Sequence, residues 1–146
     1  MKTKTIITFF AFGFILINTI SCKGNQTNSD NDKIASMLKD FYTIYINERC
    51  KMPEDFDKQD SLIKKHCTLK LQNQLQDTDL DYDIFLHGNS FELEWLNTLS
   101  ISVDKVNSSI YNIKYEYSIP NKKEIKMIKL LIVKEGDDYK IDKVLK

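Results

Sequence analysis

Apolar residues recur with a helical period in the first part of the chain that follows residue 33. The spacings of four, three and four residues place one set on a single helix face: Ile34, Leu38, Phe41 and Tyr45. Ser29 or Asp30 has the side chain that a helix N-cap requires. The pattern therefore predicts a long helix that runs to about Cys50.

Two shorter helices are expected next. Pro53 and the acidic residues 54–57 interrupt the first pattern. Asp60 or Ser61 is placed to begin a second helix, and Thr68 to cap a third. The following segment is acidic and irregular, and its Phe85 and Leu86 are expected to point inward.

The period changes from about 3.6 to 2 near Trp95, which indicates β-strands. Four such segments follow: 99–103, 111–119, 125–133 and 139–145. The third is apolar on both faces towards its end, as expected for a central strand. Short turn sequences separate the four segments, so they should form an antiparallel meander. Helices first and strands later predict an α+β domain, with the long helix on one face of a curved four-stranded sheet.

The N-terminus carries a targeting pattern. Lys2 and Lys4 precede an apolar run from Ile6 to Ile17, and Ser21 comes directly before Cys22. This order is typical of a secretory signal peptide, and the run is short for a membrane span of roughly 20 residues. The end of the run resembles the lipobox of bacterial lipoproteins, although Thr19 stands where that family most often has Leu.

The lipobox resemblance implies cleavage before Cys22 and a lipid on that residue. The alternative is an ordinary signal peptide with an unrelated cysteine. Residues 22–32 are polar and predict a flexible tether. The expected organisation is thus a signal peptide over 1–21, a tether over 22–32 and one domain over 33–146, within an ordinary domain size.

Charge limits the range of partners. The whole chain has 21 basic and 21 acidic residues, and the chain from Cys22 onward has a formal charge of −2. A nucleic-acid partner is not expected, because phosphate binding needs a surplus of Lys and Arg. Little electrostatic attraction to an anionic membrane remains, so the lipid on Cys22 would provide the membrane contact. The expected location is the bacterial cell envelope, periplasmic or surface-facing.

Cys50 and Cys67 remain after the anchor residue. An exported protein meets an oxidising compartment, so a disulfide between them is one interpretation. The other is two separate thiols, because the sequence gives no Cα–Cα distance. Catalysis by Cys67 is not expected, since the adjacent His66 points in a different direction on a helix.

Four aspartates alternate in the acidic segment: Asp77, Asp79, Asp81 and Asp83. Calcium prefers several oxygen ligands from one loop, but the glycine and the final carboxylate of an EF-hand are missing here. A solvated loop in which aspartates cap backbone amides is the preferred interpretation, and no metal is predicted.

Enzymatic chemistry has little support. His66 and His87, with Asp81 or Asp83, could form an acid–base pair. However, no HExxH, GxSxG, GxGxxG or phosphate-loop motif is present. We therefore predict a non-enzymatic protein without a cofactor.

Several short motifs carry a family resemblance. They are the segments 41–45, 71–75, 81–85 and 138–144. On these the chain resembles the domain of unknown function 3828 family, small bacterial lipoproteins with a cystatin-like or nuclear-transport-factor-2-like fold. The resemblance implies a conical fold with a cavity, and it provides no catalytic residues.

The aromatic residues supply the candidate binding surface. If the helix and the sheet converge at the open end of a cone, four of them would lie there: Tyr42, Tyr45, Trp95 and Tyr115. Burial in the core is the competing interpretation. The predicted function is a lipid-anchored binding or accessory module with an unknown protein or small-molecule partner. The alternatives are an immunity-type toxin inhibitor that uses the acidic loop 77–83, and a small enzyme built on the cavity.

Overall fold

The computed structural model describes residues 23–77, 82–119 and 122–145, with side chains from residue 29 onward and not at Asp77. The signal peptide, Cys22, Asp79 and Asp81 lie outside the described residues. Within the described residues, three α-helices and one 3₁₀-helix come first: α1 (Lys23–Arg49), α2 (Phe56–His66), α3 (Leu69–Asp77) and η1 (Leu93–Asn97). Four strands follow: β1 (Ser100–Val103), β2 (Ile110–Ile119), β3 (Lys122–Glu135) and β4 (Asp138–Leu145).

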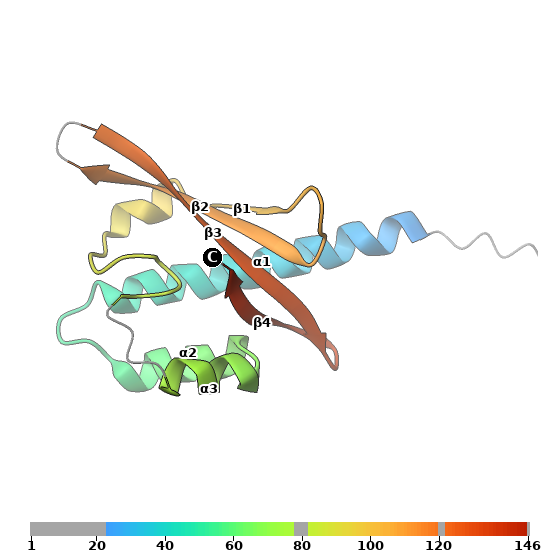
Figure 1. Cartoon of the computed structure of the whole chain (residues 1–146), viewed down its shortest axis with the longest axis horizontal. Coiled ribbons are helices and arrows are strands. Elements are labelled where there is room, and N and C mark those ends of the chain that lie inside the picture. Colours follow the sequence, from blue (N-terminus) through green and yellow to red (C-terminus); the bar gives the residue numbers. More distant parts are fainter. Residues whose placement is uncertain (1–22, 78–81, 120–121, 146) are drawn as a thin grey trace, which may run out of the picture.

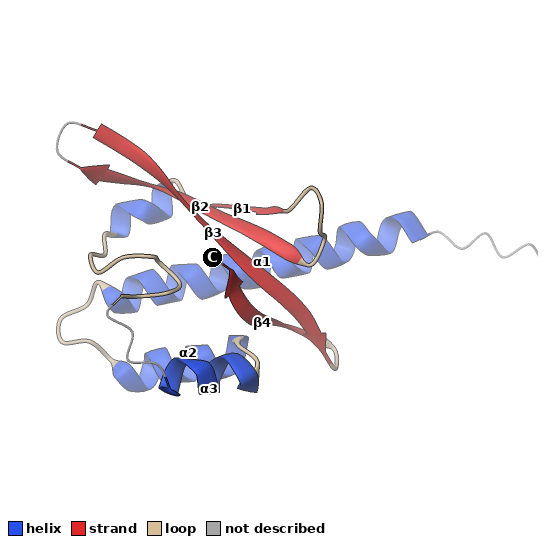
Figure 2. Ribbon diagram, in the orientation of Figure 1, coloured by secondary structure: helices blue, strands red, loops and turns tan. Residues whose placement is uncertain are grey.

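The strands form one antiparallel sheet in the order β1-β2-β3-β4, so β3 has a strand on each side, as expected. The β2–β3 hairpin is the longest pair, and its far end extends past β1 and β4 (Figure 1). The helices lie together on one side of this sheet (Figure 2). The α+β fold expected from the sequence is therefore confirmed.

Helix α1 begins earlier than predicted. It starts at Lys23 and not at Ser29 or Asp30, so residues 23–32, where a tether was expected, are helical. No proline interrupts this segment, and once a helix is nucleated each further residue adds one hydrogen bond. The Tyr111 hydroxyl also donates a hydrogen bond to Asn31 Oδ1 at 2.8 Å, which fastens this end of α1 to β2.

Helix α2 also begins earlier than predicted. Asp55, and not Asp60 or Ser61, is its N-cap, and the Asp55 side chain accepts a hydrogen bond from the backbone N–H of Lys58. The acidic residues 54–57, which were expected to interrupt the helical pattern, thus lie at the start of α2. There, negatively charged carboxylates interact favourably with the helix dipole. The N-cap of α3 was predicted correctly, because Thr68 Oγ1 accepts a hydrogen bond from the backbone N–H of Leu71 at 3.2 Å.

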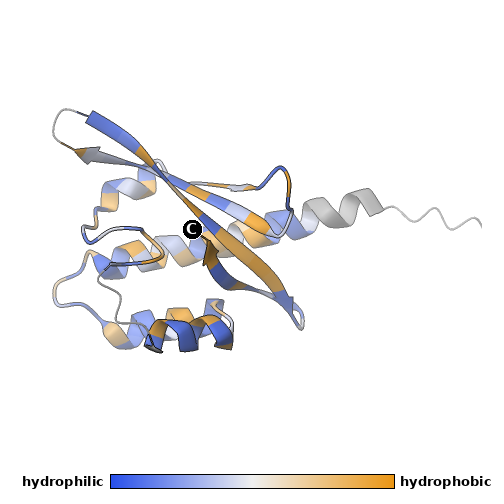
Figure 3. Cartoon of the chain, in the orientation of Figure 1, coloured by the Kyte–Doolittle hydropathy of each residue, from blue (hydrophilic) through white to orange (hydrophobic). Residues whose placement is uncertain are grey.

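The core lies between α1 and the inner face of the sheet. The helix buries its predicted stripe, including Leu38 and Phe41, against inward-pointing residues of β2 and β3 such as Ile113 and Ile128. Apolar positions on these elements are the orange segments of Figure 3. Phe85 is also buried, as expected, and its ring meets that of Phe41 edge-on at 5.2 Å.

The link between α2 and α3 is fastened to β4. Thr68 donates its backbone N–H to Ile141 O at 2.9 Å and its hydroxyl to Asp142 Oδ1 at 3.0 Å. Lys70 pairs with the other oxygen of Asp142 at 2.7 Å. These contacts fix the C-terminal end of α2, and therefore His66, beside the middle of β4.

Candidate functional site

A cavity of about 530 Å³ lies where α1, the end of α2 and the β3–β4 turn meet. We call it the His66 groove. Its described lining comprises residues 33, 36, 37 and 40 of α1, residues 65 and 66 of α2, and residues 137–140. The volume is within the range of about 300–1,000 Å³ that is typical of small-molecule sites.

Helix α1 contributes four residues from one face. Lys33, Ser36, Met37 and Asp40 are spaced at i, i+3, i+4 and i+7, so they lie one above another along the helix. Met37 is half-buried, and the other three are exposed. This face therefore presents polar groups around one apolar side chain.

The β3–β4 turn contributes the opposite wall. Gly136 has a φ of 63°, which residues with a Cβ adopt less readily, and it allows the tight reversal between Glu135 and Asp138. The turn brings Asp137 and Asp138 to the edge of the groove. The Lys140 ammonium donates a hydrogen bond to the backbone carbonyl of Lys65, at the negative end of the α2 dipole.

His66 is the most buried residue of the groove. It is 6% exposed, and its ring meets that of Phe41 edge-on at 5.8 Å. Its Nε2 is buried and has no hydrogen-bond partner among the described residues. A buried polar atom of this kind is expected to find a partner, which a water or a ligand in the groove would supply.

The surroundings of His66 favour the neutral imidazole. Burial lowers its pKa most, and the positive charges of Lys65 and Lys140 lower it further. The carboxylate of Asp40 acts in the opposite direction and is the weakest of these influences. A neutral imidazole has one nitrogen that donates and one that accepts, so it can bind either kind of ligand atom.

The groove does not hold an assembled nucleophile. Ser36, Asp40 and His66 all line it, but no hydrogen bond joins them within the described part of the chain. A serine nucleophile requires such a bond to its base. The arrangement is therefore suited to holding a ligand by charge and hydrogen bonds.

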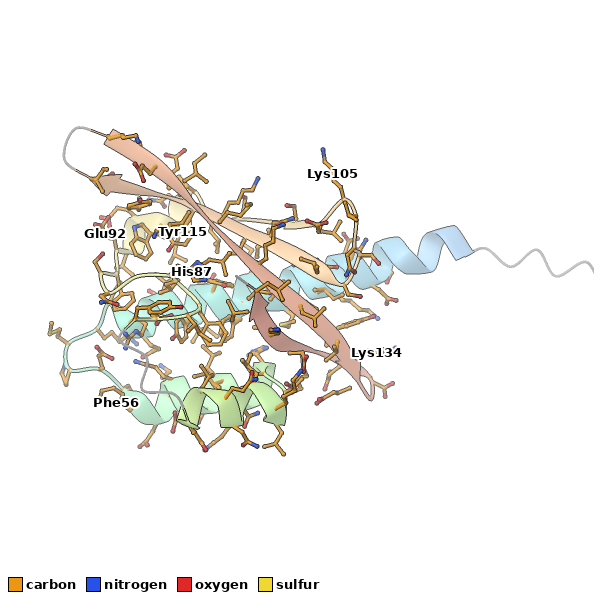
Figure 4. All side chains as sticks on the ribbon, viewed as in Figure 1. Phe56, His87, Glu92, Lys105, Tyr115 and Lys134 are labelled. Atoms are coloured by element: carbon orange, nitrogen blue, oxygen red, sulfur yellow. The ribbon has the colours of Figure 1, made fainter. Side chains whose placement is uncertain are left out.

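The four aromatic residues predicted to form an open surface are instead buried in the core. Their exposed fractions are 0% for Tyr42, 6% for Tyr45, 4% for Trp95 and 1% for Tyr115. Trp95 stacks on Tyr115 with ring centroids 4.6 Å apart, and Figure 4 shows Tyr115 beside η1. These four residues therefore lie in the core, which is the competing interpretation, and do not form the exposed aromatic surface that was expected.

The hydroxyls of these tyrosines hold the loop 82–89 in place. Tyr42 donates to Phe85 O at 3.1 Å, and Tyr115 donates to Leu86 O. Burial is the main cause that raises the pKa of both Tyr115 and Tyr42 above the ordinary value of a tyrosine. Both hydroxyls therefore act as neutral donors within the fold.

Asp83 also has a structural role. Its Oδ1 accepts from the backbone N–H groups of Phe85 and Leu86, and its Oδ2 accepts from the Tyr45 hydroxyl at 2.7 Å. Arg49 Nε lies 3.3 Å from the same Oδ2. The side chain is only 3% exposed, so it is not presented to a basic toxin surface. Within the described ranges, no cluster of His, Cys, Asp or Glu could hold a metal ion.

Cys50 and Cys67 are free thiols in the structure, which corresponds to the second of the two interpretations. Cys67 is buried and forms an isolated bridge with Ile141 of β4, whereas Cys50 directly follows the last residue of α1. Burial is the dominant cause that raises the pKa of Cys67 to about 12, so a thiolate nucleophile is not available there.

His87 is remote from His66. It occupies a turn with a φ of 49°, and its carbonyl accepts a hydrogen bond from Lys126 at 3.0 Å. Its ring faces Tyr82, with centroids 6.5 Å apart. Burial first, and Lys126 second, lower its pKa, while Asp83 raises it. The structure thus does not join His66 and His87 in one acid–base site.

The sequence did not single out the charged residues of the groove. Lys33, Asp40, Lys65 and Lys140 come from three elements, and each looks like an ordinary surface residue in the sequence. One signal was available. Met37 follows the apolar stripe of α1 but has polar neighbours at i−4 and i+3, which marks the border between core and solvent.

Comparison with known proteins adds the fold alone. No family model matches the chain, and no curated protein does. A solved structure, a protein of unknown function from Bacteroides thetaiotaomicron VPI-5482, superimposes with a TM-score of 0.70 at 18% identity. The match covers 84% of this chain and 95% of that one. In the part of the chain that the structure describes, no helix is both long and apolar enough to cross a membrane.

Proposed function

We propose that this chain is an exported lipoprotein, anchored to a membrane of the cell envelope through Cys22, whose domain binds a small polar ligand in the His66 groove. The observation that carries the binding proposal is the buried Nε2 of His66. This atom lacks a partner among the described residues, and its side chain lines a cavity of ligand size. A ligand atom at this position would remove the cost of a buried, unpaired polar group.

The anchor proposal rests on the sequence before the domain. A basic start, an apolar run and Ser21 before Cys22 match a lipoprotein leader. The mature chain has a formal charge of −2, so a lipid and not surface charge would hold it at a membrane.

Helix α1 would set the distance between the membrane and the groove. It begins directly after Cys22 and carries the groove residues Lys33 and Asp40. At 1.5 Å per residue, these positions lie about 15 to 26 Å along the helix from its start. The groove would therefore be held above the headgroup region and within reach of solutes near the membrane.

Binding without chemistry is supported by the residues present. His66 has no hydrogen-bonded serine or carboxylate partner in the described part of the chain, and the thiol of Cys67 is protonated at neutral pH. Charged side chains of both signs surround the groove. These groups can recognise a ligand, and none is arranged to activate a nucleophile.

Two measurements test this function. Intact-mass spectrometry of the protein from its own membranes should give an acylated chain that begins at Cys22, and an unprocessed or unacylated chain would refute the anchor. Saturation-transfer NMR of the mature protein with mixtures of small polar compounds should detect a binder. That signal should be lost in Lys65→Glu and kept in Lys64→Glu, which changes the adjacent exposed lysine outside the groove lining. Equal signals in both variants would refute the site.

A further inference from the structure

The His66 groove carries charges of both signs in equal number. Three lysines line it, Lys33, Lys65 and Lys140, together with three aspartates, Asp40, Asp137 and Asp138. Their formal charges cancel. A ligand of one sign, such as phosphate or a divalent cation, would meet as many repulsive as attractive groups. A ligand that carries both signs fits this lining better.

The positive and negative charges are not evenly distributed along the groove. Lys65 directly precedes His66, and Lys140 donates a hydrogen bond to the Lys65 carbonyl. Asp40 directly precedes Phe41, whose ring meets that of His66. These three charges therefore lie at the His66 end of the groove. That end has a formal charge of +1. It also holds the unpartnered Nε2 of His66, which is a donor in one imidazole tautomer. A carboxylate is the ligand group that matches these features.

The opposite end of the groove has the opposite balance. Asp30 and Tyr139 line one neighbouring pocket, which places the β3–β4 turn beside the N-terminal part of the α1 face. Lys33, Asp137 and Asp138 therefore lie together at this end, with a formal charge of −1. Both aspartates are exposed and have no ion-pair partner among the described residues. An ammonium group is the ligand group that matches them.

The length of the groove limits the ligand further. Lys33 and Asp40 mark its two ends on α1 and are seven residues apart, which is about 10 Å along a helix. An extended peptide spans about 3.3–3.6 Å per residue, so about three residues cover this distance. Between the ends, the half-buried Met37 and Tyr139 offer apolar contact to side chains.

We infer that the ligand of the His66 groove is a short peptide of about three residues with free ends, whose carboxylate lies at His66 and Lys65 and whose ammonium group lies at Asp137 and Asp138. This inference rests on the proposed function, since it names the ligand class of the same site. The carboxylate accepts hydrogen bonds from His66 and the two lysines. The ammonium group forms ion pairs with the carboxylates of Asp137 and Asp138 in the β3–β4 turn.

Calorimetric titration of the mature full chain tests the inference with four probes. They are tri-alanine with free ends, N-acetyl-tri-alanine, tri-alanine amide, and the peptide blocked at both ends. We expect the free peptide to bind most tightly, and each single block to weaken binding at least 10-fold. Alanine and hexa-alanine should bind more weakly than tri-alanine. Equal affinity for the free and the doubly blocked peptide would overturn the inference.

Substitutions separate the two ends of the site. Lys65→Gln should remove most of the preference for the free carboxylate over the amide, and Lys64→Gln should keep it. The double change Asp137→Asn, Asp138→Asn should remove the preference for the free amine while keeping that for the carboxylate. If neither preference changes, the assignment of the ends is wrong.

The outcomes distinguish this inference from the proposed function. If no alanine peptide binds but another small compound does, with a signal that depends on Lys65 and not on Lys64, the groove is a ligand site and the peptide class is wrong. If no compound gives such a signal, the proposed binding function itself fails.

Discussion

The Tyr45 hydroxyl donates a hydrogen bond to Asp83 Oδ2 at 2.7 Å, and this contact joins α1 to the loop 82–89. Asp83 also accepts from two backbone N–H groups of that loop. Burial raises its pKa, and the Tyr45 hydrogen bond and the Arg49 charge lower it again. The carboxylate thus replaces regular backbone pairing in a loop that has little secondary structure.

Replacement of Asp83 should destabilise the protein. Asp83→Ala leaves the Tyr45 hydroxyl and the backbone N–H groups of Phe85 and Leu86 without their acceptor. Loss of one member of such a buried cluster costs about 3 kcal/mol of unfolding free energy. Urea denaturation measures this loss of unfolding free energy. Asp60→Ala, an exposed change in α2, should cost less than about 0.5 kcal/mol, and a similar cost for both would contradict the structural role.

Thr68 offers a second test of stability. Its hydroxyl caps α3 and donates to Asp142. Thr68→Ala should lower the unfolding free energy by about 1 to 2 kcal/mol, because both contacts are lost. Thr68→Ser retains the hydroxyl and should recover most of this loss. Equal destabilisation by the two changes would show that the methyl group, and not the hydroxyl, matters.

The regular elements could be predicted from the sequence because each buries one face. The alternation of Tyr111 and Ile113 with polar residues fixes which side of β2 meets the core, and both are buried as expected. The first residue of each helix was harder to predict. A carboxylate such as Asp55 can interrupt one helix or cap the next, and only its bond to the Lys58 N–H distinguishes the two.

The candidate site was predicted poorly for a different reason. Aromatic residues are equally suited to a ligand pocket and to a hydrophobic core, so the sequence cannot distinguish the two. In the structure, Trp95 packs on Tyr115 within the core. The groove combines charged residues from α1, α2 and β4 that are far apart in the sequence; Lys33 and Lys65, for example, are 32 positions apart. No local pattern in the sequence brings such residues together.

The thiol of Cys67 should be unreactive in the folded protein. Its pKa of about 12, compared with 9.0 for a free thiol, lowers the thiolate fraction at pH 8 by about 1,000-fold. Alkylation by iodoacetamide followed by peptide mass mapping should label Cys67 only after unfolding. Cys50, which is partly exposed, should react faster in the native state. Recovery of a Cys50–Cys67 disulfide peptide from the exported protein would contradict this prediction.

Acid should destabilise the protein partly through His66. Burial lowers the pKa of the folded-state imidazole below 6.5, so the unfolded chain takes up a proton more readily. This histidine's contribution is present above pH 6.5 and is lost as the pH falls towards the folded-state pKa. Denaturation at pH 7.5 to 5 should therefore show a shallower decline for His66→Gln than for the wild type.

His87 is the appropriate comparison for that experiment. Burial and Lys126 also lower its pKa, so His87→Gln should reduce the acid dependence in the same direction. The double variant should show the shallowest decline. An unchanged pH dependence in His66→Gln would mean that the imidazole is not held neutral by its surroundings.

Imidazole NMR tests the binding proposal most directly, because the chain has only two histidines and they lie in different parts of the fold. The mature protein would be titrated with small polar solutes extracted from the cell envelope. We predict that the Nε2 and Nδ1 signals of His66 shift in a saturable manner, while those of His87 stay in place. Signals of His66 that do not move, or that move only together with those of His87, would contradict a ligand site in the groove.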